Sequence, residues 1–178
     1  MTIMDKINSV TRAAAQVMLD KEAVNYLEAG SMYGIIAQGR YNMAVLSVLY
    51  NHAQDSELKE LIKEAIEDLT KLTIERCEAL MKAGDAEIPV FDWTERKLHD
   101  HLDIPADARL TDAEIAATIG TLAKGAQMAC LSALHQSYQL EIGTMFRERL
   151  DAGLDWNYRL LQLMLKRGWL PHLAKVTH

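Results

Sequence analysis

The sequence predicts an all-α protein, a four-helix bundle made of two helical hairpins. Nine glycines and three prolines in 178 residues leave few chain breaks, which favours long helices. No window alternates apolar and polar residues over a strand length, so we expect no sheet. An apolar fraction of 49% excludes a disordered chain and suffices for one core, so residues 1–178 are expected to form a single domain.

The first hairpin is expected over about residues 12–84. Its first helix begins somewhere between Thr11 and Glu22, where no start is well marked, and ends near residues 51–54. Asp55 is a favourable N-cap and Glu57 lies in the first turn of the helix that follows. That second helix is expected to run to about residue 82, where Gly84 stops it.

The second hairpin is expected over residues 111–168. Thr111 and Glu114 have the spacing of a capping box, which predicts a third helix from there to about residues 135–138. The fourth helix covers about residues 141–167 and ends at Gly168, with a bend expected at Gly153. Both halves read as a nearly apolar helix, a turn, a charged helix and a glycine, which suggests two copies of one hairpin.

Residues 85–110 join the hairpins, and their length predicts the topology. A helix of about 28 residues is ~42 Å long, a distance that this segment can cover. Neighbouring antiparallel helices need much shorter loops. We therefore expect a crossover that makes the second and third helices parallel, the ferritin-like arrangement. Residues 92–96 could form a short helix within it, and Phe91 and Trp93 are expected to anchor it.

Ferritin-like bundles often hold two metal ions between carboxylates and Glu-x-x-His motifs. This sequence contains no Glu-x-x-His, and residues 30–54 and 115–140 contain no acidic residue. We therefore expect no di-metal site, no cofactor and no catalytic residues. A metal-dependent oxidoreductase is the disfavoured alternative.

Three other features are candidate sites. His99, Asp100, His101 and Asp103 form the densest ligand-type cluster, but a solvated loop explains them better than a metal does. His52 and His135 would lie at opposite ends of the bundle and so cannot share a metal.

Gln38, Arg40, Tyr41 and Asn42 form a polar island in the apolar first helix. This polar island could line a small-molecule pocket or form a hydrogen-bonded interface. A purely structural role is the favoured interpretation.

The first and third helices carry one charged residue each over residues 30–50 and 115–135, Arg40 and Lys124. Such helices either bury a second face in a homo-oligomer, for which we favour a dimer, or have outer faces of small residues. A net charge of −6 argues against nucleic-acid binding. Polar residues within 30–50 argue against a membrane span. Two cysteines and no secretory signal predict a cytoplasmic protein.

Three short motifs carry a family resemblance: residues 110–114 (LTDAE), residues 55–58 (DSEL) and residues 165–171 (LKRGWLP). They resemble an uncharacterised ferritin-like family of spore-forming bacteria that is loosely related to spore coat proteins, over about residues 19–171. The resemblance implies stacked hairpins and spore association, and it transfers no catalytic residue. Our leading hypothesis is a non-enzymatic oligomeric bundle with a structural, stress or sporulation role. The alternative is a small-molecule binder that uses the polar island.

Overall fold

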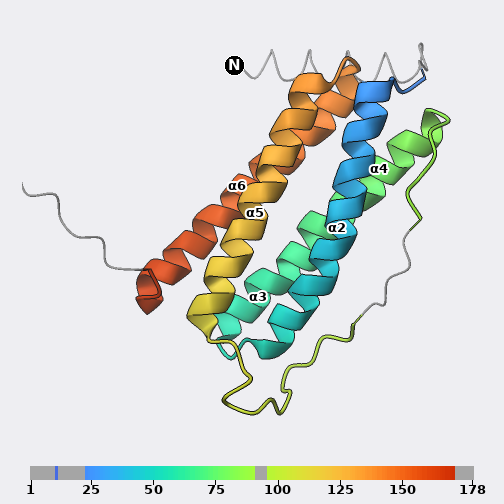
Figure 1. Ribbon diagram of the computed structural model, residues 1–178. Helices are drawn as coiled ribbons and strands as arrows, with labels where there is room; N and C mark the ends of the chain where they lie inside the picture. Colours follow the sequence, from blue (N-terminus) through green and yellow to red (C-terminus); the bar gives the residue numbers. More distant parts are fainter. Residues whose placement is uncertain (1–10, 12–22, 91–95, 171–178) are drawn as a thin grey trace, which may run out of the picture.

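The computed structural model describes residue 11 and residues 23–90 and 96–170, which form an all-helical bundle (Figure 1). The helices are α2 (Tyr26–His52), α3 (Ser56–Glu64), α4 (Leu72–Ala83), α5 (Asp112–Gln136) and α6 (Leu140–Arg167). A π-helical segment, η1 (Ala65–Lys71), joins α3 to α4, so these three elements form one rod. No strand occurs within the described ranges, as the sequence predicts.

The predicted start of the first helix is wrong. Helix α2 begins at Tyr26, because the Asn25 side chain accepts hydrogen bonds from the backbone N–H groups of Leu27 and Glu28. The Glu28 carboxylate bonds back to the Asn25 backbone, which completes a capping box. Helix α6 runs through Gly153 without interruption, so the glycine does not end the helix there. The caps predicted at Asp55, at Thr111 with Glu114, and at Gly168 are confirmed.

Polar contacts at the helix ends fix the directions of the four rods. Ser31, near the start of α2, bonds Gln136 at the end of α5, over 2.9 Å. Glu57, at the start of α3, pairs with Lys166 at the end of α6, over 2.9 Å. Helix α5 is therefore antiparallel to α2, and α6 is antiparallel to the α3–α4 rod. It follows that α4 and α5 are parallel, as the crossover predicts.

The crossover is held against one end of the bundle. The Tyr50 hydroxyl donates to Asp100, and Asn51 bonds the backbone of Lys97 and His99. Lys59 donates to two crossover carbonyls while its ammonium group lies 4.6 Å from the Tyr50 ring centroid. The expected anchors Phe91 and Trp93, and the short helix expected at residues 92–96, fall largely outside the described residues.

Two carboxylates clamp the hairpin turns, each reaching from the other hairpin. Glu28 Oε1 accepts the backbone N–H groups of Tyr138 and Gln139, both over 2.8 Å, in the α5–α6 turn. Asp112 accepts those of Gln54 and Asp55, over 2.8 and 3.1 Å, in the α2–α3 turn. We call these pairs the two turn clamps. They satisfy backbone donors that a tight turn leaves open.

Candidate functional site

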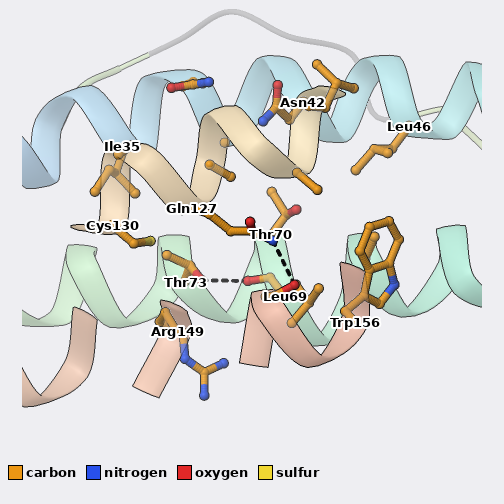
Figure 2. Close-up of a pocket in the computed structure, with 18 of the residues that line it drawn as sticks. Ile35, Asn42, Leu46, Leu69, Thr70, Thr73, Gln127, Cys130, Arg149 and Trp156 are labelled. Atoms are coloured by element: carbon orange, nitrogen blue, oxygen red, sulfur yellow. Dashed lines mark hydrogen bonds between the residues drawn. The ribbon is translucent and has the colours of Figure 1, made fainter. Parts of the chain in front are cut away.

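A cavity of about 100 Å³ lies at the centre of the bundle, where all four rods meet. Its walls are mostly apolar and include Ile35 of α2, Leu69 of η1, Ile119 of α5 and Trp156 of α6 (Figure 2). The lining residues that are exposed are Gln38 of α2 and Ala126 of α5. The cavity therefore opens between α2 and α5.

The π-helical segment forms one wall, and its widened turn is held by side chains from around it. The Trp156 indole N–H donates to the Leu61 carbonyl over 2.9 Å, and the Thr73 hydroxyl donates to the Leu69 carbonyl over 2.6 Å. Arg149 reaches the Asp68 carbonyl over 3.4 Å. The Leu61 carbonyl, in α3, and the Leu69 carbonyl also accept backbone N–H groups, so these side-chain donors add to the backbone hydrogen bonds around η1.

Polar groups in the cavity come from three rods. Gln127 crosses its centre from α5 towards Thr70 of η1 (Figure 2). The Gln127 amide nitrogen donates to the Gly153 carbonyl over 2.8 Å, which fixes the orientation of the amide. Gln38 and Asn42 lie on the α2 side. Gln127 is not among the residues expected from the sequence, although a lone amide in an apolar helix is a detectable signal.

The four side chains of the polar island point to three different places. Gln38 and Asn42, one helical turn apart, both line the cavity. The Arg40 guanidinium instead pairs with Glu78 of α4, and its Nε is buried without a hydrogen-bond partner. Tyr41 points outward and is 64% exposed. Successive helical residues are turned by about 100°, so four neighbours cannot share one pocket.

The candidate ligand cluster in the crossover is a surface feature. Asp100 accepts the Tyr50 hydroxyl over 3.1 Å, and His101 and Asp103 are exposed. His52 Nδ1 accepts the backbone N–H of Leu110 over 3.3 Å. Among the residues that the structure describes, no three His, Cys, Asp or Glu side chains gather closely enough to hold a metal ion.

The two cysteines are free, buried thiols on facing rods. Burial raises the pKa of Cys77 to about 12, and the neighbouring Cys130 and Glu78 add to that rise. Burial raises the pKa of Cys130, which lines the cavity, to about 11, although the Arg149 guanidinium opposes it. Both groups are therefore neutral thiols near pH 7, and neither is an activated nucleophile.

Within residues 23–90 and 96–170, no helix is both long and apolar enough to cross a bilayer. This finding agrees with the expectation that residues 30–50 are not a membrane span.

Comparisons with known proteins give a family and a fold. The family model described as "Protein of unknown function (DUF3231)" matches residues 13–174. The "Uncharacterized protein YvdQ" of Bacillus subtilis is 26% identical over 149 residues, which is 84% of this chain and 86% of that protein. A crystal structure of a "putative spore coat protein" from Bacillus halodurans is 26% identical, with a TM-score of 0.75. The match covers 88% of this chain and 98% of that one.

Proposed function

We propose that this chain, which belongs to the DUF3231 family of unknown function, is a non-enzymatic helical-bundle protein with a structural, spore-associated role. The spore coat description of a structural neighbour supports the spore link. The crossover that makes α4 and α5 parallel supports a ferritin-like topology for this single domain. Two buried, free thiols support a reducing, cytoplasmic compartment.

The proposal depends on one surface, where large apolar side chains on the outer face of α2 lie beside small side chains on the outer face of α5. Large apolar side chains lie exposed on α2, among them Tyr33, Tyr41 and Val45. The neighbouring outer positions of α5 include Ala117, Thr121 and Gly125, which are small and exposed. Two copies packed through these helices would cover the aromatic rings with surfaces that allow close approach.

A second apolar stripe makes the test sharper. Helix α6 exposes Leu154, Tyr158, Leu161 and Leu165, so it offers a competing surface. Light scattering coupled to size exclusion should find a dimer that Tyr33→Lys dissociates and Tyr158→Lys leaves intact. A monomeric wild-type protein would remove the proposal, and dissociation by Tyr158→Lys alone would move the interface to α6.

The second candidate function is the binding of a small molecule in the cavity. Its support is that Gln38 and Asn42, half of the polar island, line a cavity between the four rods. Native mass spectrometry of the protein purified from its own cells should then find added mass on the intact chain. A chain of bare mass under gentle conditions would count against this candidate. The disfavoured oxidoreductase would return only if elemental analysis found stoichiometric iron or manganese.

A further inference from the structure

The size of the cavity limits what could occupy it. Its volume of about 100 Å³ is somewhat below the ~150 Å³ of an engineered apolar cavity that binds benzene. The opening between Gln38 and Ala126 adds room at one side. The space therefore suits a molecule no larger than about one benzene ring, with a small substituent in the opening.

The walls of the cavity exclude a charged occupant. Apolar side chains dominate the lining, and Trp156 and Ile119 close its inner end. Arg149 is the charged residue among the lining residues, but its guanidinium points away from the space, as Figure 2 shows. An ion moved into this space would lose its hydration without gaining a counter-ion. The occupant is therefore neutral.

One polar group is positioned to recognise the occupant. Because the Gln127 nitrogen is held by the Gly153 carbonyl, its Oε1 is left as an acceptor in the cavity. Within the described residues, no hydrogen bond joins this oxygen or the Thr70 hydroxyl to another group. An oriented acceptor among apolar walls favours a ligand with a single O–H or N–H donor.

We infer that this cavity binds a small neutral molecule of the phenol or short-alcohol class, whose hydroxyl donates to Gln127 Oε1. The inference rests on the second candidate function, and it names the chemistry of that site. It does not depend on dimer formation, which light scattering measures without any ligand.

The test uses phenol as the probe, with benzene as the matched analogue that lacks the donor. Binding is followed by calorimetry and by the NMR signal of the Trp156 indole N–H, which lies at the cavity wall. Phenol should shift this signal in the wild-type protein. Gln127→Met keeps similar bulk without the acceptor, and it should weaken phenol binding about tenfold while changing benzene binding less than twofold.

A filling variant and its control test the location. Ala123→Leu places three more carbons in the cavity and should abolish phenol binding, whereas Thr118→Leu, at an exposed position of the same helix outside the lining, should not. If phenol and benzene both fail to bind, the inference is overturned. If both bind equally and Gln127→Met changes neither, the donor class is overturned while the second candidate function stands.

Discussion

The two hairpins have the same parts in different forms. In hairpin one, η1 interrupts the second rod, while its counterpart α6 in hairpin two is a continuous helix. Hairpin one ends with a left-handed residue at Asp85, after Gly84, and hairpin two ends with one at Gly168 itself. The cavity lies against η1. The comparison teaches that the internal space lies beside the rod that departs from regular α-helix.

The two turn clamps also differ, in how many carboxylates form the clamp and the neighbouring capping box. Glu28 is 1% exposed and also belongs to the capping box of α2. In hairpin two these duties are divided, because Glu114 completes the capping box and Asp112 forms the clamp. One buried carboxylate therefore holds one end of the bundle, and two more exposed ones hold the other.

The largest expected effect concerns thiol chemistry. With pKa values of about 12 for Cys77 and about 11 for Cys130, against 9.0 for a free thiol, the thiolate populations fall roughly 1000-fold and 100-fold. Alkylation of the native protein at pH 8, followed by mass spectrometry, should therefore be slow, with Cys130 modified before Cys77. Rapid modification of Cys77 before Cys130 would contradict the burial of the Cys77 thiol.

The next effect separates the two turn clamps. Glu28→Ala leaves partly buried N–H groups of the α5–α6 turn without acceptors and removes the capping box of α2, so it should lower the free energy of unfolding by about 3 kcal/mol. Asp112→Ala opens a more exposed turn and should cost about 1 kcal/mol. Urea denaturation of both variants measures the difference. Equal losses would mean that the two ends are held equally.

A smaller effect is expected where α6 supports the rod that contains η1. Trp156→Phe removes the donor to the Leu61 carbonyl and should cost about 1.5 kcal/mol. Trp169→Phe, at a partly buried position after α6, is the matched control and should cost less. If Trp156→Phe unfolds at the same urea concentration as the wild type, the hydrogen bond from the Trp156 indole to the Leu61 carbonyl contributes no stability.

The smallest effect is a pH dependence at the α3–α6 contact. Burial alone would raise the pKa of Asp55, but hydrogen bonds from Arg167 and from the Leu58 N–H outweigh it and lower that pKa. The Lys166 hydrogen bond lowers the pKa of Glu57. Lowered carboxyl pKa values stabilise the fold above about pH 4, and this stability is lost as the pH falls through the folded-state values. Unfolding midpoints between pH 6 and pH 3 should fall less steeply in Arg167→Met than in the wild type.

Local signals predicted most of the helices. Asp55, Thr111 with Glu114, and Gly168 act through their immediate neighbours, so short motifs revealed them. Asn25 with Glu28 is an equally local capping pair, but the residues before it are also compatible with a helix, so the sequence marks no single start.

Features that depend on packing could not be predicted in this way. The second bond set of Glu28 is to residues about 110 positions away, and no spacing rule reports such a pair. The η1 segment has no sequence signal of its own, and the side chains that contact its backbone and the turn before it, Arg149 at Asp68 and Trp156 at Leu61, come from the other hairpin. The polar island indicated where polar residues enter the apolar helix. Only the packing of the helices shows that Gln38 and Asn42 line the cavity while Arg40 and Tyr41 do not.

The crossed arrangement of the turn clamps has a consequence for how the chain folds. A hairpin formed alone would have a turn with open backbone donors, because the carboxylate that closes it belongs to the other hairpin. We therefore expect neither hairpin to be an independently stable folding unit, and the two should acquire protection together. Amide hydrogen exchange at Gln54 and Asp55 and at Tyr138 and Gln139 should report a single shared opening reaction, the docking of one half of the chain on the other.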